Sequence, residues 1–285
     1  MIRFGGPVFG LNGTEATDPE RLADEHKKKG YRAAYAPRLS LAWTDEIKAF
    51  RRAFERADVM IAEVGYWENL MDLDPGARES NRREMTEALA LAEELGARCA
   101  VDIFGSYCYG KGDETHDARN FSDEAFEEAV YMARYFIDAV KPKTAYFTYE
   151  VFPFSIVDSP DSIERLIAAV DREQFGVHLD LTNMINCPRL YWDNAGLAVE
   201  CARRFGDRIV SSHVKDIKMK QPALSVMLEE VLPGTGAVDF GAYARTLDGL
   251  PRQIPFMMEH LSTEEEYDRA AAHIRAEVKR AGITI

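Results

Sequence analysis

Three carboxylates and one imidazole stand at the ends of four short apolar segments in the second half of the chain. They are Glu150, Asp180, His213 and Glu259, and a segment of helical character follows each of them. In a parallel barrel the carboxyl ends of all strands open on one face, so these four side chains would converge there. Three carboxylates and one imidazole make an oxygen-rich set of the kind that binds a divalent cation. The four residues therefore predict a metal site and favour an enzyme.

Any one of these residues, taken alone, could be a helix N-cap or half of a surface salt bridge. The positions before each acid are apolar, however, as in Phe147 and Tyr149 before Glu150. A charge at the end of a buried strand needs a partner. Several carboxylates in adjacent strands would repel one another unless a cation lay between them. The joint pattern therefore favours metal binding over four independent surface roles.

The elements that must position these side chains alternate regularly along the chain. Strand-like segments cover residues 2–5, 33–37, 59–65, 98–105, 144–150, 175–181, 209–214 and 255–261. Helix-like segments cover residues 18–29, 45–57, 79–95, 122–140, 160–170, 192–205, 239–248 and 263–281. Eight strand–helix units in about 250 residues are typical of a (β/α)8 barrel. We therefore predict an α/β protein whose residues 1–285 form a single (β/α)8 TIM barrel domain.

A doubly wound open sheet is the structural alternative. It usually carries a glycine-rich phosphate loop after the first strand, and the segment Gly5-Gly6-Pro7 lacks that pattern. The long connections also follow strands rather than helices, which is where barrel enzymes build their active sites. These connections are residues 66–78, 105–121, 182–191 and 215–238. The closed barrel is therefore favoured.

Composition narrows the classes of partner. The 285 residues carry a formal net charge of −13, which argues against nucleic acid, since phosphate backbones attract basic surfaces. No apolar run approaches the length of about 18 residues that a membrane span needs. The four cysteines form no CxxC pair, and the N-terminus lacks a secretory signal pattern. We therefore expect a cytoplasmic protein with no nucleic-acid or membrane partner.

The ordered set Glu, Asp, His, Glu at the ends of the last four strands resembles the xylose-isomerase-like sugar phosphate isomerase/epimerase superfamily. Four segments carry the resemblance, which extends over essentially the whole chain: HLDLTN at 178–183, SHVKD at 212–216, PGTGAVDF at 233–240 and MEHL at 258–261. The resemblance implies a TIM barrel in which Glu150, Asp180, His213 and Glu259 bind the metal. It also implies that Glu150 and Glu259 are catalytic and exchange protons with a substrate carbon.

The chain departs from the ketose epimerases of this superfamily at two places. Those enzymes usually have a substrate-binding His three residues after the Asp ligand, where this chain has Asn183. They also have an Arg shortly after the His ligand, where this chain has Lys215 and Lys218. Endonuclease IV, another member, uses several metals and many His ligands, whereas this acidic chain has six His in total. Nuclease activity is therefore not favoured.

Further residues near the expected barrel mouth are candidates for binding substrate. His116 in the loop after the fourth strand, Trp67 after the third, Asn183 and Lys215 form this set. An aromatic ring at a barrel mouth can stack on a sugar, although plain packing explains a Trp equally well. His178 lies two residues before Asp180, so it shares the same side of its strand one layer deeper. It is expected to orient a ligand rather than to bind the metal itself.

These observations predict a metal-dependent isomerase or epimerase acting on a small carbohydrate by proton transfer through an ene-diolate. Mn²⁺, Mg²⁺ or Co²⁺ is favoured for this ligand set, and Zn²⁺ is an alternative. A second hypothesis is a metal-dependent lyase or dehydratase acting on a keto-inositol or 3-keto-glycoside. A third is a non-catalytic sugar-binding barrel. We expect an unphosphorylated substrate because no phosphate-loop pattern follows the last two strands. The sequence does not determine the oligomeric state, and a homo-oligomer is one possibility.

Overall fold

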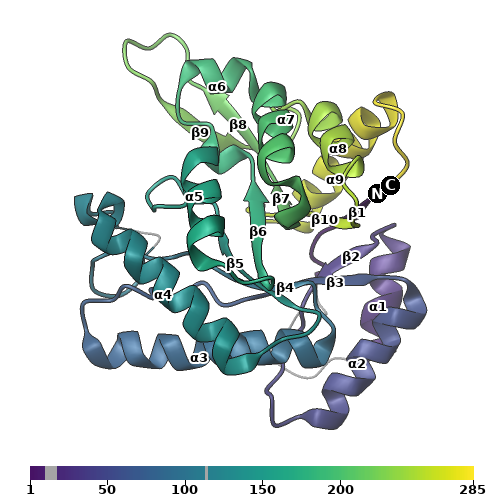
Figure 1. The fold of residues 1–285 in the computed structure, drawn as a ribbon. Coiled ribbons are helices and arrows are strands. Elements are labelled where there is room, and N and C mark those ends of the chain that lie inside the picture. Colours follow the sequence, from purple (N-terminus) through teal and green to yellow (C-terminus); the bar gives the residue numbers. More distant parts are fainter. Residues whose placement is uncertain (10–17, 113–114) are drawn as a thin grey trace.

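Eight parallel strands close into a barrel in the computed structural model, which describes residues 1–9, 18–112 and 115–285 (Figure 1). The order around the barrel is β1-β10-β7-β6-β5-β4-β3-β2. The strands are β1 (Ile2–Gly5), β2 (Ala33–Tyr35), β3 (Met60–Gly65), β4 (Cys99–Asp102), β5 (Tyr146–Glu150), β6 (Phe175–Asp180), β7 (Ile209–Val214) and β10 (Ile254–Met258). The predicted (β/α)8 barrel is thereby confirmed, and the open-sheet alternative is excluded.

Helices pack around the outside of the barrel, each against its neighbours in the chain (Figure 1). They are α1 (Pro19–Lys28), α2 (Thr44–Ala57), α3 (Pro75–Leu95), α4 (Asp123–Val140), α5 (Pro160–Val170), α6 (Pro188–Trp192), α7 (Asn194–Phe205), α8 (Phe240–Asp248) and α9 (Glu264–Arg280). Three short 3-10 helices lie at Ala118–Phe121, Thr182–Met184 and Gly206–Arg208. Among the described residues no helix is long and apolar enough to cross a membrane.

Several element boundaries differ from the sequence-based expectation, and at two helix starts a proline gives the physical reason. Helix α3 begins at Pro75 instead of residue 79, because the Asp74 side chain caps it by accepting the Ala77 N–H at 2.8 Å. The short helix α6 also begins with a proline, at Pro188, inside a connection that we expected to be irregular. In both places Pro at the first helical position starts the helix earlier than the apolar periodicity indicates.

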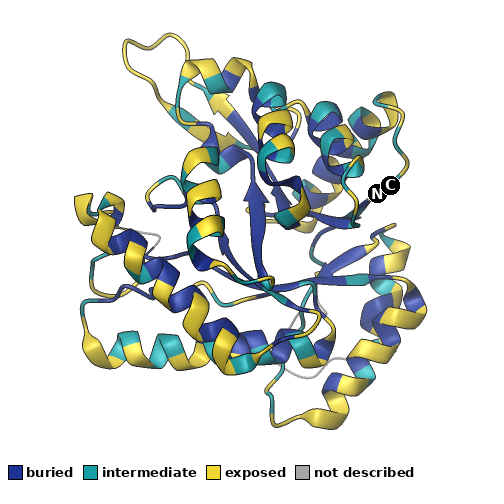
Figure 2. Ribbon diagram, in the orientation of Figure 1, coloured by how far each residue is buried: buried dark blue, intermediate teal, exposed yellow. Residues whose placement is uncertain are grey.

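The alternation of side chains along each strand separates the core from the barrel interior. In β5, Phe147 and Tyr149 face outward, where Phe147 packs against Phe136 of α4 at a ring distance of 5.0 Å. Glu150, one residue beyond Tyr149, therefore faces the inside of the barrel. The strands are buried along most of their length, while the outer helices are buried only on their inner faces (Figure 2). The alternation of side chains thus points a polar residue into the barrel from a strand that is otherwise apolar.

A two-stranded antiparallel hairpin interrupts the connection between β7 and α8. Its strands are β8 (Asp216–Met219) and β9 (Leu228–Val231), and the segment between them projects from the body of the barrel (Figure 1). Residues 215–238 were predicted as a connection after the seventh strand, without strands of its own, and no tight turn signal joins β8 to β9. The hairpin is the main element that sequence patterning missed.

The Asp216 side chain anchors the chain that leaves this hairpin. Its carboxylate accepts N–H groups from Gly234 at 2.9 Å, Gly236 at 2.9 Å and Val238 at 3.0 Å. A Cβ atom on Gly236 would lie 2.3 Å from Asp216 Oδ1, so only glycine fits there. Gly236 therefore allows the backbone to wrap closely around the Asp216 carboxylate.

Candidate metal centre

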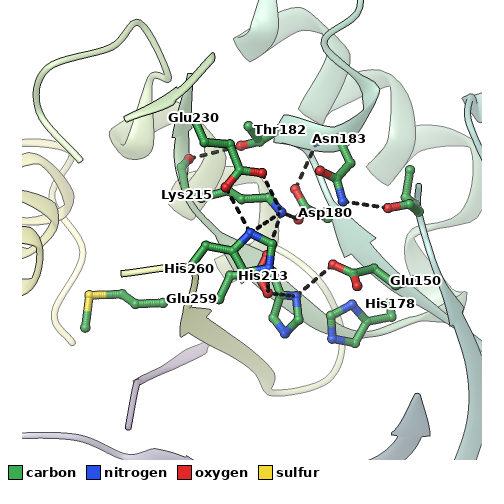
Figure 3. A network of polar contacts seen from close by, with 12 residues as sticks. Glu150, His178, Asp180, Thr182, Asn183, His213, Lys215, Glu230, Glu259 and His260 are labelled. Carbon is green, nitrogen blue, oxygen red and sulfur yellow. Dashed lines mark hydrogen bonds and ion pairs between the residues drawn. The ribbon is translucent and has the colours of Figure 1, made fainter. Parts of the chain in front are cut away.

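The four residues singled out in the sequence meet at the carboxyl end of the barrel (Figure 3). Glu150 ends β5, Asp180 ends β6, His213 is the last residue but one of β7, and Glu259 follows β10 directly. One ligand atom from each residue lies within 4.8 Å of the corresponding atoms of the others. His213 Nδ1 is 2.8 Å from both Glu150 Oε1 and Glu259 Oε2. The barrel thus brings the four side chains into one cluster.

The donor set of this cluster fits a divalent cation. Burial, together with the charges of Glu259 and Glu150, raises the pKa of Asp180 to about 7 against the lowering effect of Lys215. Asp180 Oδ2 and Glu259 Oε1 are buried and accept no aligned hydrogen bond from any described residue. Buried carboxylate oxygens in this state are costly unless a cation compensates them. Three carboxylates and one imidazole nitrogen, with two of the carboxylate oxygens free of aligned hydrogen bonds, therefore form a site suited to a metal ion.

Lys215 lies inside this cluster rather than at its rim. Its Nζ is 2.9 Å from Asp180 Oδ2, 2.7 Å from Glu259 Oε1 and 3.3 Å from Glu230 Oε1 (Figure 3). The ammonium is close to these oxygens without the alignment of a hydrogen bond for the first two. A substrate contact by Lys215, expected from the sequence, stays a prediction. In this arrangement the ammonium is already surrounded by carboxylates.

A second layer of polar residues lies directly beneath the cluster. Glu63 of β3 is fully buried, with Oε2 2.8 Å from His178 Nε2 and Oε1 3.1 Å from His213 Nε2. Burial alone would raise the pKa of Glu63, but the two imidazoles lower it to about 2. His178 therefore lies one layer deeper, as its spacing from Asp180 indicated. Glu63 was missed, although an acid within the apolar segment VMIAEVG was the available signal.

A cavity of about 340 Å³ opens onto the candidate metal centre. Its lining residues come from both halves of the barrel: Pro7, Tyr35, Glu63, Trp67, Ile103, Glu150, Phe152, Asn183, His213, Glu259, His260 and Tyr267. Trp67 and Asn183, both expected to bind substrate, are among them. His116 is not among them; its exposed ring lies 4.1 Å from the ring of Phe154, measured between centroids. A substrate contact by His116 stays a prediction.

Trp67 is held over the cavity by an unusual backbone. Its φ is 60°, a left-handed value that is strained for a bulky residue. The indole folds back so closely that a Cβ on Gly65 would lie 2.2 Å from Trp67 Nε1. The next N–H, of Glu68, donates to Asp102 Oδ1 at 3.1 Å, and Asp102 is fully buried at the end of β4. The roles of Gly65 and Asp102 in placing this ring had no visible signal in the sequence.

The hairpin places a charged side chain at the edge of the cavity. Glu230 of β9 reaches His260, whose Nδ1 is 2.9 Å from Glu230 Oε2 and whose Nε2 is 3.5 Å from Glu259 Oε2. The hydrogen bond to Glu230 raises the pKa of His260, in opposition to its partial burial. Neither residue was a candidate from the sequence, because their contact depends on the hairpin that patterning missed.

Three solved structures share this architecture over nearly the whole chain. A probable 3-DHS dehydratase from Bacillus anthracis is 13% identical with a TM-score of 0.68, over 98% of this chain and 100% of that one. A xylose isomerase-like TIM barrel protein from Mycobacterium smegmatis, in complex with magnesium, is 14% identical with a TM-score of 0.67, over 99% and 97%. A D-psicose 3-epimerase from Clostridium cellulolyticum H10, with D-tagatose, is 15% identical with a TM-score of 0.67, over 99% and 98%. At these identities the likeness extends to the fold alone.

The family assignment has a separate basis in the sequence. No curated protein gives a significant match to the chain. The family model described as the xylose isomerase-like TIM barrel, by contrast, matches residues 23–277. That span includes every strand from β2 to β10 and all four residues of the central cluster. The chain therefore belongs to the xylose isomerase-like TIM barrel family.

Proposed function

We propose that the protein is a divalent-metal-dependent enzyme that moves a proton at the carbon next to the carbonyl of a small carbohydrate, as an isomerase or epimerase. The observation that carries this proposal is the placement of two glutamates beside one imidazole nitrogen. Glu150 and Glu259 come from different strands, and each has an oxygen 2.8 Å from His213 Nδ1. Two carboxylates from different strands beside one centre suit a reaction in which one removes a proton and the other returns it.

In this proposal Glu150, Asp180, His213 and Glu259 hold the cation, with Mn²⁺, Mg²⁺ or Co²⁺ favoured and Zn²⁺ as the alternative. A divalent cation supplies Lewis-acid chemistry, which polarises a carbonyl and acidifies the neighbouring C–H bond. The magnesium bound by the related M. smegmatis protein supports a metal in this fold. Glu63 Oε1 lies 3.1 Å from His213 Nε2; in the proposed metal-bound state it would accept the Nε2 proton and leave Nδ1 as the ligand atom.

The proton transfer itself is assigned to Glu150 and Glu259. One glutamate takes the proton from the substrate carbon, and the other delivers a proton. Delivery to the opposite face of the same carbon is epimerisation, and delivery to the neighbouring carbon is isomerisation. Trp67 lines the cavity with a largely apolar ring and offers a surface for a sugar. The D-psicose 3-epimerase among the structural neighbours supports this class of reaction.

We propose an unphosphorylated keto-sugar or polyol as the substrate. A phosphate dianion needs a free cation or a nest of N–H groups at the cavity. Lys215 is enclosed by three carboxylates, and Lys218 is exposed on β8 and does not line the cavity. The carboxylates of Glu63, Glu150 and Glu259 line it instead. This charge distribution opposes a strongly anionic group.

None of the four cysteines forms a disulfide, which supports a cytoplasmic location.

A lyase or dehydratase acting on a keto-inositol or 3-keto-glycoside is the second candidate, and Asn183 favours it. Asn183 stands where ketose epimerases of this family usually have a histidine. Its Nδ2 donates to Val151 O at 2.9 Å and its N–H to Asp180 Oδ1 at 3.1 Å. A fixed amide thus replaces the substrate-binding imidazole of those enzymes, so the substrate is expected to be held differently from an ordinary ketose. The probable dehydratase from B. anthracis supports an elimination on this fold.

The deciding experiment is metal analysis of the purified protein followed by a substrate screen in D₂O. The screen covers free and phosphorylated ketoses, inososes and keto-glycosides. Deuterium incorporation without loss of a group is the expected result and means an epimerase or isomerase. Release of water or of an aglycone means a lyase. Ligand binding with neither outcome, in metal-loaded protein, would mean a non-catalytic sugar-binding barrel and would overturn the proposal.

A further inference from the structure

Lys215 is a buried lysine enclosed by carboxylates of the candidate metal centre and the hairpin. Its side chain is only 4% exposed, and Asp180, Glu259 and Glu230 all lie within 3.3 Å of its Nζ. A buried ammonium is costly unless opposite charges surround it. These carboxylates therefore account for a charged lysine at this depth.

The ammonium joins two side chains that belong to strands separated by a third. Asp180 ends β6 and Glu259 follows β10, with β7 between them in the barrel. In each carboxylate one oxygen faces Lys215 and the other contacts a different residue. Asp180 Oδ2 faces Lys215, and Oδ1 accepts the Asn183 N–H. Glu259 Oε1 faces Lys215, and Oε2 faces His213. Lys215 thus orients two of the four proposed ligands at once. Its own backbone is held by Thr182, whose hydroxyl donates to Lys215 O at 3.0 Å.

A divalent cation bound by these residues would compete with the ammonium for the same negative charge. Lys215 Nζ is 2.7–2.9 Å from two oxygens that accept no aligned hydrogen bond, so those oxygens are compensated by charge alone. Like charges that share a buried site repel strongly. Glu230, on the hairpin and with a side chain 42% exposed, is a third carboxylate that can keep the ammonium when a metal takes the other two.

We propose that Lys215 is a built-in counter-cation that stabilises the metal-free site and limits how tightly the site holds a divalent ion, with Glu230 as the alternative acceptor for its ammonium. The inference rests on the proposed metal site, but not on any particular substrate or reaction. It assigns Lys215 a positioning role and explains why a positive residue lies among the proposed ligands. It also gives Lys215 a role that Lys218 does not have, because Lys218 is exposed on β8 and touches none of the four proposed metal ligands.

The test compares Lys215→Met with Glu230→Gln and with the matched control Lys218→Met. For each protein, the dissociation constant for Mn²⁺ is measured from the EPR signal of free Mn²⁺. The melting temperature is measured after chelator treatment and again with saturating Mn²⁺. Neither readout requires turnover, so a wrong assignment of the reaction would not affect it.

Lys215→Met is expected to bind Mn²⁺ at least about tenfold more tightly than the wild type, since a neighbouring positive charge is lost. Its metal-free melting temperature should fall by roughly 5–10 °C, because breaking a buried ion pair leaves carboxylates unpaired. Saturating Mn²⁺ should recover most of that loss. Glu230→Gln should weaken Mn²⁺ binding, and Lys218→Met should match the wild type in every measurement.

Three results would overturn the inference. One is a Lys215→Met protein whose affinity for Mn²⁺ is unchanged or weaker. Another is an equal loss of melting temperature with and without Mn²⁺, which would mean a purely structural lysine. The third is a variant that fails to fold even when Mn²⁺ is supplied. If the wild type binds no Mn²⁺ at all, the proposed metal site itself fails, and the inference fails with it; wild-type binding without turnover would contradict only the proposed reaction.

Discussion

The two halves of the barrel contribute to the candidate metal centre in different ways. The strands of the second half, β5, β6, β7 and β10, carry the four clustered residues at or directly beside their carboxyl ends. The first half contributes none of the four, but β3 supplies Glu63 beneath His213, and the chain after β3 supplies Trp67 above it. The second half therefore holds the groups proposed for the chemistry, and the first half holds those groups in position.

The largest expected effect lies in the second half. Glu150→Gln and Glu259→Gln should each lower kcat by about 10³-fold or more, because each variant removes a proton-transferring carboxylate. The fold should persist, as checked by circular dichroism, and metal content must be measured alongside to separate lost chemistry from lost metal. Wild-type turnover in either variant would end the two-glutamate mechanism and remove the functional distinction between the halves.

Asp180→Asn tests the second half through stability instead of turnover. In the metal-free protein the pKa of Asp180 is raised to about 7 by burial and by the carboxylates of Glu259 and Glu150. A buried acid with a raised pKa stabilises the folded state less as it ionises, so stability should fall as pH rises from about 4 to about 7.

Melting curves of chelator-treated protein at a series of pH values check this expectation. Asp180→Asn should flatten the pH dependence over that range and should also lower metal content. A slope that is the same in wild type and variant would assign the pH dependence to other groups and leave Asp180 without the role proposed for it.

Glu63→Gln measures how much the first half matters to the metal. The neutral amide no longer carries the negative charge that faces His213 Nε2 at 3.1 Å and helps to orient the ring. Partners of metal-binding histidines usually contribute 10–100-fold to affinity or activity, so a loss of about that size in Mn²⁺ affinity is expected. An affinity within about twofold of the wild type would show that the first half is not needed to hold the centre.

The smallest expected effect is at the aromatic ring over the cavity. Gly65→Ala places a Cβ where the Trp67 indole lies, so the ring should shift and KM should rise by about fivefold with kcat little changed. Gly249→Ala is the matched control, since a Cβ there meets only ordinary contacts at 3.6 Å. Unchanged KM and unchanged tryptophan fluorescence in Gly65→Ala would remove Trp67 from the proposed substrate contacts.

Local sequence patterns were sufficient to predict the barrel and the convergence of the four polar residues at the ends of its strands. Short apolar segments with a period of two, separated by amphipathic segments, imply parallel strands, and parallel strands put their carboxyl ends on one face. Glu150, Asp180, His213 and Glu259 could be recognised because each follows directly on such a segment. The same period also indicated that His178 lies one layer below Asp180.

The tertiary structure alone decided which residues surround that cluster. Glu63 and His213 are 150 positions apart and meet only across the barrel. The enclosure of Lys215 depends on Glu230, and therefore on a hairpin whose strands have no joining turn signal. The position of Trp67 depends on a left-handed backbone and on the missing side chain of Gly65. Periodicity reports which face of an element a residue occupies, whereas the distances and charges that set a site's chemistry arise only when separate elements close on one another.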